Sequence, residues 1–362
     1  MHRDQTRTPA LIVDCDALDR NIATMAAFAN AMGVALRPHA KSHKSPEIAR
    51  RLAAAGAVGS SCATIDEAEA LASGGIAGIL ITSPIAAPHM FMRLGRLLAR
   101  GADVMVVTDS PRNVAELAAI ADTERRPLSV IVEIDVGVGR TGCLDVADAV
   151  DLAKEIAKQP TLRFAGVQGY WGNLQQVMPF AERKQRVATQ ADKLHKLVTA
   201  LRAEALAPPI VTGGGTGTHW LDVTHGVFTE LQPGSYLFLD SCYGSIPVTP
   251  DGNPFVPSLF VAASVVSANR PGRVIVNSGY KAFATDSGMP KPMRGVPPNS
   301  TYRFMGDEHG AIDFEGAASP AVGTTIELLT SHCDPTVNLY ASLLIARGEE
   351  IVDEWPIMAR GY

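Results

Sequence analysis

The sequence predicts a (β/α)8 barrel followed by a mostly β second domain. Three observations favour this architecture. Eight short apolar runs alternate with helical segments between residues 34 and 232, the unusual polar and glycine-rich segments lie just after those runs, and the helical pattern disappears from about Ile246. Apolar runs of this kind suit parallel strands that are buried on both faces. A doubly wound sheet shows the same alternation, and the number of strands alone does not exclude it.

The barrel elements follow one another with short connections. Strands are expected at 34–36, 58–62, 78–82, 103–107, 128–135, 163–169, 209–212 and 230–232. Helices are expected at 46–56, 64–74, 90–99, 111–122, 146–158 and within 179–206. Pro46 and Pro111 suit the first position of a helix, and Thr64 with Glu67 forms a capping box at the start of another. A strand at 10–14 and a helix at 17–32 come before this series.

The chain is long enough for two domains. We expect the barrel at 10–245 and the β domain at 246–362, and the N-terminal strand within 1–14 is a candidate member of the second domain. Strands of the β domain are expected at 259–268, 273–277 and 325–329, with a hairpin formed by 343–346 and 350–355.

Composition excludes several classes of protein. Hydrophobic residues make up 46% of the chain and charged residues 19%, which is typical of a globular protein. A net charge of -5 argues against a nucleic-acid partner. The apolar segments are too short for a membrane span or a signal-peptide core. The five cysteines are scattered, which suits reduced thiols, so we expect a cytoplasmic protein.

The segment from Arg37 to Lys44 reads R-P-H-A-K-S-H-K and follows the first barrel strand. It brings together two lysines, two histidines and an arginine. Neighbouring positive charge lowers the pKa of a lysine, so one amine here is a candidate nucleophile that forms Schiff bases near neutral pH. A basic loop that binds phosphate or faces water is the alternative, and this segment alone does not decide between them.

The run Gly213-Gly214-Gly215-Thr216-Gly217-Thr218 follows the seventh strand. Its backbone N–H groups and hydroxyls predict a phosphate cradle, and barrel enzymes often hold phosphate on their last two loops. Gly234 and Ser235, after the eighth strand, are expected on the other side of the same phosphate. A flexible loop is the alternative.

Three further segments contain candidate site residues. Arg140 lies in a glycine-rich turn after the fifth strand, where a structural salt bridge is the alternative, and Tyr170 and Trp171 follow the sixth strand, where ordinary core aromatics are the alternative. On an extended chain His332 and Asp334 would share a face and could bind one divalent metal. A histidine with a carboxylate suits Mn, Co, Mg or Zn, whereas an unliganded turn is the default.

Five segments together resemble the D-threonine aldolase and D-serine dehydratase family, which comprises fold-type III, alanine-racemase-like enzymes that use pyridoxal 5′-phosphate (PLP). They are 37–41, 166–173, 213–218, 233–236 and 332–338. The resemblance implies a homodimer in which Lys41 carries the Schiff base, Arg140 contacts the phenolic oxygen and Tyr170 the ring nitrogen. It also implies a metal on His332 and Asp334. The phosphate would contact Gly213, Gly214, Gly215, Thr216, Gly234, Ser235 and Tyr236.

The metal segment indicates a branch within this family. The resemblance implies His-x-Asp for the aldolases and His-x-Cys for the D-serine dehydratases, and this chain has His332 and Asp334. The expected reaction is therefore cleavage of D-threonine or a related D-3-hydroxy amino acid, 3-hydroxyaspartate included, to glycine and an aldehyde. A dehydratase in which Lys41 removes the α-proton is the first alternative. A non-enzymatic PLP carrier is the second, and the long β domain argues against it.

Overall fold

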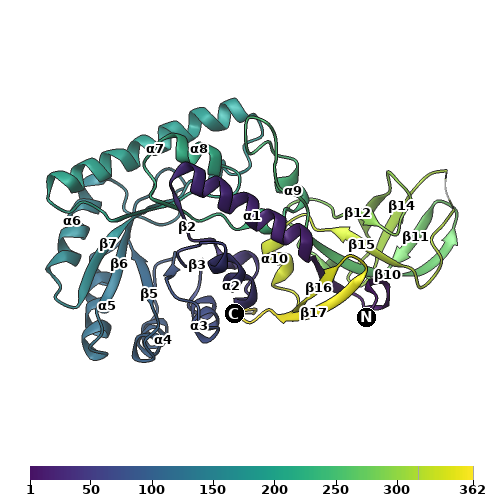
Figure 1. Cartoon of the computed structure of the whole chain (residues 1–362), viewed down its shortest axis with the longest axis horizontal. Coiled ribbons are helices and arrows are strands. Elements are labelled where there is room, and N and C mark those ends of the chain that lie inside the picture. The colour runs from purple at the N-terminus through teal and green to yellow at the C-terminus, as the bar shows by residue number, and fades with distance from the viewer. Residues whose placement is uncertain (317, 362) are drawn as a thin grey trace.

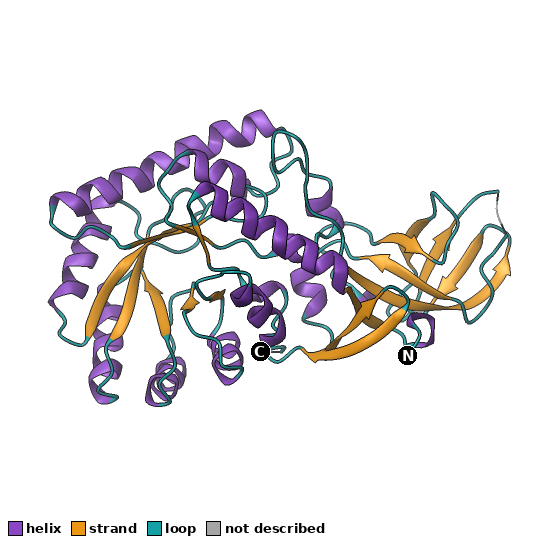
Figure 2. Ribbon diagram, viewed as in Figure 1, coloured by secondary structure: helices purple, strands orange, loops and turns teal. Residues whose placement is uncertain are grey.

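The structure is a computed structural model that describes residues 1–316 and 318–361. Two sheets lie side by side along the long axis of the molecule (Figure 1). Helices surround the first sheet, whereas the second consists almost entirely of strands and loops (Figure 2). The chain begins in the second sheet, and its last residues return toward the first, where the Met358 N–H donates to the Lys44 carbonyl.

The first sheet has eight strands in the order β2-β9-β8-β7-β6-β5-β4-β3, and every pair is parallel. The two ends of this order meet, because the N–H of Val58 donates to the Leu36 carbonyl at 2.8 Å and the N–H of Ser61 to the Pro38 carbonyl at 3.0 Å. The predicted barrel is confirmed, and the doubly wound sheet is excluded. The strands are β2 (Ala35–Leu36), β3 (Ser60–Cys62), β4 (Ile79–Ile81), β5 (Val104–Thr108), β6 (Leu128–Glu133), β7 (Leu162–Gly169), β8 (Ile210–Gly213) and β9 (Glu230–Leu231).

Local sequence explains most of the helices. Asp14 accepts the Ala17 N–H at the start of the first helix, and Gly33 ends that helix in the left-handed conformation. The Thr64 hydroxyl accepts the Glu67 N–H, and the Glu67 carboxylate accepts the Ala63 N–H. The helices are α1 (Cys15–Met32), α2 (Pro46–Ala54), α3 (Ile65–Ser73), α4 (Pro88–Ala99), α5 (Pro111–Thr123), α6 (Val146–Lys158), α7 (Phe180–Ala203), α8 (His219–Thr224), α9 (Ser241–Gly244) and α10 (Cys333–Val337).

The second sheet has nine strands. Strand β1 belongs to it, because β1 pairs antiparallel with β10 and parallel with β16. Three short strands, β12, β13 and β14, were not predicted, because four residues with mixed polarity give no clear alternation. The strands are β1 (Ala10–Asp14), β10 (Leu259–Arg270), β11 (Arg273–Val276), β12 (Lys291–Arg294), β13 (Thr301–Phe304), β14 (Gly310–Asp313), β15 (Thr325–Leu329), β16 (Ser342–Arg347) and β17 (Glu350–Pro356).

Two further findings concern the class of protein. All five cysteines are free thiols. Within residues 1–316 and 318–361, no helix is both long enough and apolar enough to cross a membrane.

Candidate active site

A pocket of about 650 Å³, counted with its open mouth, lies at the carboxyl ends of the barrel strands. Its position is the one where barrel enzymes place their active sites. The loops after β2, β7, β8 and β9 all contribute to it, because closure of the barrel brings the first and last strands together. Of the residues singled out from the sequence, the pocket is lined by Lys41, Arg140, Tyr170, Gly214, Gly215, Thr216, Gly234 and Ser235.

Lys41 lies in the short 3-10 turn Ala40–Ser42, where its N–H donates to Nδ1 of His39. Its amine lies 3.4 Å from the Asp334 carboxylate, which comes from the second domain, and 44% of its side chain is exposed to solvent. The Asp334 charge raises the pKa of Lys41 above its usual value, against the effect of burial. The expected lowering of that pKa by neighbouring cations is therefore wrong for this structure, because Asp334 compensates the positive charge.

Three of the other four basic residues of this segment are not in the pocket lining. Arg37 forms a buried pair with Glu230, with Nε to Oε1 at 2.8 Å and Nη2 to Oε2 at 2.9 Å. The Lys44 amine contacts Glu67 at 3.4 Å. His43 is fully buried, and burial lowers its pKa to about 3. The sequence thus predicted a cluster of five cationic groups, but the turn directs them to different neighbours.

His39 also lines the pocket and is held in one neutral form. Its Nδ1 accepts the Lys41 N–H, so the proton is on Nε2, which lies 3.1 Å from the Thr82 hydroxyl. Burial, followed by the charges of Lys41, His43 and Arg140, lowers the pKa of His39 well below its usual value. With both nitrogens engaged, His39 is suited to form an uncharged wall beside the Lys41 amine.

The residues after β8 and β9, where the sequence predicts a phosphate site, contribute backbone amides to the pocket. Among the described residues, the backbone N–H groups of Thr216 and Ser235 have no hydrogen-bond partner, and both residues line the pocket. The ends of the first and last strands are in close contact, because a Cβ at Gly234 would lie 2.9 Å from the His39 carbonyl. Free amides beside a lysine amine match the phosphate and aldehyde ends of PLP.

Gly213 and Tyr236 are not in the pocket lining. The Tyr236 side chain is fully buried and packs against Phe255, with ring centroids 5.3 Å apart. Its backbone N–H donates to the Thr216 hydroxyl at 3.0 Å. Tyr236 therefore supports the phosphate side of the pocket from behind.

Arg140 and Tyr170 lie together at the mouth of the pocket. The Asp135 carboxylate accepts the N–H groups of Gly137, Val138 and Gly139 and so shapes the turn that carries Arg140. The Arg140 guanidinium lies 5.7 Å from the centre of the Tyr170 ring. Within the described chain Arg140 forms no ion pair with a carboxylate, so the structural salt bridge considered from the sequence is not found.

The predicted metal segment is not fully extended. His332 is extended and precedes helix α10, which begins at Cys333, so Asp334 lies in a helical turn. Its Oδ1 is buried and has no hydrogen-bond partner, whereas its Oδ2 faces Lys41. Nδ1 of His332 lies 2.6 Å from the Asp286 carboxylate, which leaves Nε2 for another ligand. An unpartnered carboxylate oxygen near a held imidazole fits a divalent cation.

Asp240 joins the predicted metal segment to the barrel. Its carboxylate accepts the Tyr243 N–H in α9 and the Cys333 N–H in α10, both at 2.9 Å. Sequence spacing gave no sign of this contact, because it joins residues from the two domains. It fixes the turn that carries Asp334 against the last loop of the barrel.

Several polar residues of the pocket were not recognised from the sequence. Nε2 of Gln232 donates to Oε1 of Gln168 at 3.1 Å, and Nε2 of Gln168 donates to the buried Glu133 at 3.0 Å. Tyr243 also lines the pocket, together with Ser235. Gln168 and Gln232 each end an apolar run, and this was the only available signal.

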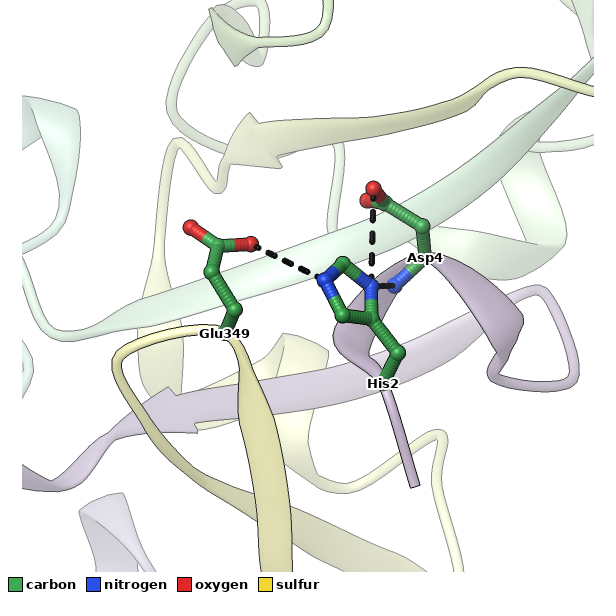
Figure 3. Close-up of side chains that lie close together, drawn as sticks. All are labelled: His2, Asp4 and Glu349. Carbon is green, nitrogen blue, oxygen red and sulfur yellow. Dashed lines mark hydrogen bonds and ion pairs between the residues drawn. The ribbon is translucent and has the colours of Figure 1, made fainter.

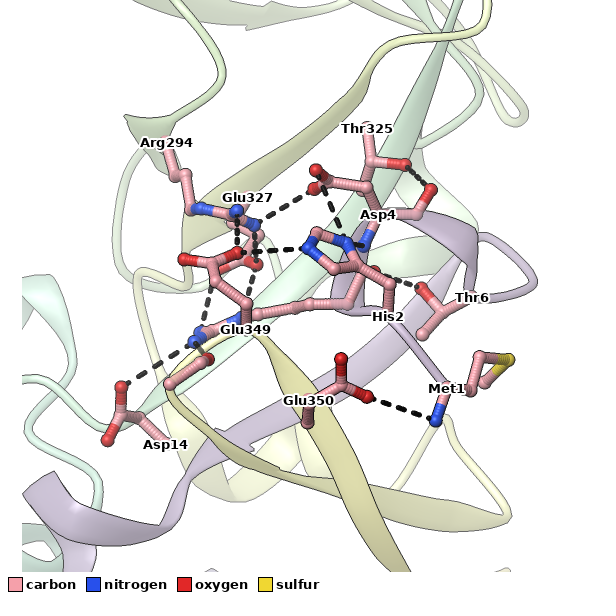
Figure 4. A network of polar contacts seen from close by, with 12 residues as sticks. Met1, His2, Asp4, Thr6, Asp14, Arg294, Thr325, Glu327, Glu349 and Glu350 are labelled. Atoms are coloured by element: carbon pink, nitrogen blue, oxygen red, sulfur yellow. Dashed lines mark hydrogen bonds and ion pairs between the residues drawn. The ribbon is translucent and has the colours of Figure 1, made fainter.

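In the part of the chain that the structure describes, one group of three possible metal ligands is found, and it lies outside the pocket lining. His2, Asp4 and Glu349 offer ligand atoms within 4.8 Å of one another (Figure 3). Arg294 already pairs with Asp4 at 3.0 Å and with Glu349, and it also contacts the buried Glu327 (Figure 4). We interpret this group as an ion-pair network that fixes the N-terminal segment to the second sheet.

His219 gives the protein a pH-dependent stability. Its Nδ1–H donates to the Thr216 carbonyl, and burial lowers its pKa to about 4. The unfolded chain binds a proton below about pH 6.5 that the folded state does not, so stability is lost as the pH falls from there to about 4. His219→Asn keeps a donor for Thr216 without the titration. Between pH 7 and pH 4 we expect the variant to lose about 3 kcal/mol less than the wild type in urea unfolding. Equal losses would contradict this.

Fold and pocket together define a class: barrel enzymes of the alanine-racemase-like fold, with a lysine at the barrel mouth and a β domain that reaches into the site. Residues 13–242 match the family described as "Alanine racemase, N-terminal domain", and residues 258–346 match "Putative serine dehydratase domain". The chain belongs to the D-threonine aldolase and D-serine dehydratase family, on the side of the D-threonine and 3-hydroxy-D-aspartate aldolases, and it is a lyase.

The similarity to individual proteins spans the whole chain. A 3-hydroxy-D-aspartate aldolase of Paracoccus denitrificans is 37% identical over 100% of this chain and 94% of its own length. A D-threonine aldolase of Arthrobacter sp. is 38% identical over 98% of this chain and 93% of its own length. The crystal structure of D-threonine aldolase from Filomicrobium marinum superposes with a TM-score of 0.94 at 39% identity, over 99% of this chain and 96% of that one.

Proposed function

We propose that the protein is a PLP- and divalent-metal-dependent aldolase that cleaves D-threonine or a related D-3-hydroxy amino acid to glycine and an aldehyde. The observation that carries the proposal is the 3.4 Å contact between the Lys41 amine and the Asp334 carboxylate. Lys41 lines the pocket together with Thr216 and Ser235, whose amides have no partner in the described chain, and this supports an amine, an anion site and a metal-binding carboxylate as parts of one site. The names of the relatives support the same reaction.

Each group has a role that follows from its position. The Lys41 amine would bond covalently to the cofactor aldehyde, the amides of Thr216 and Ser235 would hold its phosphate, and Arg140 and Tyr170 would contact its ring. When bound, PLP supplies an electron sink for the bond that breaks at the substrate α-carbon. His332 and Asp334 would hold the metal, whose chemistry is to lower the pKa of a hydroxyl group that it binds.

The protein residues also restrict proton transfer. Both nitrogens of His39 are engaged, and His43 is buried outside the pocket. We therefore assign neither histidine the removal of a proton from the substrate. His39 keeps an uncharged surface next to Lys41, so the ion pair with Asp334 decides the charge of the free amine before the cofactor binds.

The proposal extends to features of the whole protein. We propose a cytoplasmic homodimer, with a barrel at 10–245 and a β domain at 246–362 that includes the N-terminal strand. Manganese is our first choice among Mn, Co, Mg and Zn, because an imidazole with a carboxylate suits borderline to hard ions. Light scattering of the purified protein would test the dimer.

Product identification separates this aldolase from a dehydratase. We expect D-threonine and D-3-hydroxyaspartate to give glycine and an aldehyde in the presence of manganese, and little product after treatment with a chelator. D-serine serves as the third substrate, because a dehydratase converts it to a keto acid and ammonia. Keto acid and ammonia as the main products from all three substrates would favour the dehydratase and overturn the proposal.

A further inference from the structure

Asp222 is a fully buried carboxylate on helix α8, behind the 213–218 loop and outside the pocket lining. Three donors converge on it. The indole Nε1–H of Trp171 donates to Oδ1 at 2.7 Å, and Oδ2 accepts the Thr218 hydroxyl at 2.9 Å and the Gly215 N–H at 3.2 Å. Asp222 therefore joins the loop after β7 to the loop after β8.

Gln175 holds the same loop from another side. Its Oε1 accepts the Gly217 N–H at 2.9 Å, and its Nε2 donates to the Thr218 hydroxyl at 2.8 Å. The Gly215 and Gly217 amides are therefore both turned into the protein. The Thr216 N–H, between them, has no partner in the described chain, and Thr216 lines the pocket.

The glycines of this loop are explained by the same two side chains. A Cβ at Gly214 would lie 2.4 Å from Oδ2 of Asp222, and a Cβ at Gly215 would lie 2.5 Å from Oε1 of Gln175. Real Cβ atoms essentially never lie within 3 Å of another residue's heavy atoms. The glycine run lets Asp222 and Gln175 approach the backbone, in addition to leaving room for a ligand.

We propose that Asp222 is a positioning residue for the cofactor phosphate: it holds the 213–218 loop so that the Thr216 amide faces the pocket. This inference rests on the proposed PLP site. Burial disfavours the charged form of the Asp222 carboxylate and raises its pKa to about 7, although the three hydrogen bonds act in the opposite direction. Asn in its place cannot serve all three donors, because its amide nitrogen would face either Trp171 or the Gly215 and Thr218 donors.

The test compares binding of PLP with binding of pyridoxal, which has the aldehyde but no phosphate. Both are titrated by absorbance into the full-length protein from which cofactor has been removed. For Asp222→Asn we expect the affinity for PLP to fall about tenfold or more, as for a lost hydrogen bond to a charged group, while the affinity for pyridoxal stays near that of the wild type. A general loss of structure would weaken both.

Two further variants complete the experiment. Thr218→Val removes a hydroxyl that donates a hydrogen bond to Asp222. We expect it to lower the affinity for PLP relative to that for pyridoxal, and it replaces Asp222→Asn if that variant does not fold. Glu327→Gln changes a buried carboxylate in the second sheet and is expected to reduce stability without changing the ratio of the two affinities.

The outcomes separate the inference from the proposed function. An unchanged ratio of PLP to pyridoxal affinity in both Asp222→Asn and Thr218→Val overturns the role of Asp222 and leaves the PLP site intact. A wild-type protein that binds PLP no better than pyridoxal, or binds neither, overturns the proposed phosphate site itself, and the inference with it.

Discussion

Replacing Lys41 with alanine or arginine is expected to abolish covalent attachment of PLP and to reduce activity by about three orders of magnitude or more. Lys41 is the only lysine in the pocket lining within the described chain, and its amine faces Asp334 at 3.4 Å. Arginine keeps the charge opposite Asp334 but has no primary amine. Absorbance of the lysine-bound cofactor, followed by borohydride reduction and mass spectrometry of the peptides, measures the effect.

The wild-type protein provides the decisive comparison. Reduction should place the cofactor on Lys41 and leave Lys44 unmodified, since the Lys44 amine is buried against Asn338 and the Ala359 carbonyl. Attachment at another lysine, or a Lys41→Ala protein that keeps both absorbance and activity, would refute the assignment.

Changing Asp334 to asparagine should leave the cofactor absorbance in place and remove the metal-dependent activity. A bound metal stabilises developing charge by several kcal/mol, so we expect a loss of at least about a hundredfold, and chelation of the wild type should give a similar loss. The physical basis is the buried Oδ1 of Asp334, which has no partner in the described chain. Rates are compared with and without added manganese.

Asp307→Asn is the matched control, because Asp307 is an exposed carboxylate of the same domain and lies outside the pocket lining. It should respond to manganese and chelator as the wild type does. If Asp334→Asn keeps full activity, or if chelation leaves the wild type unchanged, the metal has no part in the reaction and only a PLP-dependent cleavage remains.

Much of the fold could be predicted, because buried strands and helix ends each have a recognisable local sequence pattern. Parallel strands buried on both faces read as apolar runs, and proline, threonine and glycine at the helix ends mark where each helix begins or stops. Strand β4, Ile79–Ile81, is buried along its whole length and was readily recognised. Strands β12 and β13 were missed, because each has only four residues of mixed polarity with no clear alternation between buried and exposed positions.

The site was predictable in outline, but its electrostatics were not. The position of Lys41 after a strand indicated the barrel mouth, whereas the direction of its pKa shift depends on Asp334, nearly three hundred residues later in the chain. The glycine run indicated a phosphate site, but Asp222 and Gln175 decide which of its amides faces the pocket.

The sequence alone predicted the barrel, the lysine at its mouth and the family, because these predictions depend on local patterns and on motifs of adjacent residues. Only the tertiary structure decided which charges meet. The turn after β2 directs Arg37 and Lys44 to buried carboxylates, and helix α10 brings Asp334 to Lys41. Coulombic interactions depend on distance in space, and distance in space between remote segments is fixed by packing and barrel closure rather than by spacing along the chain.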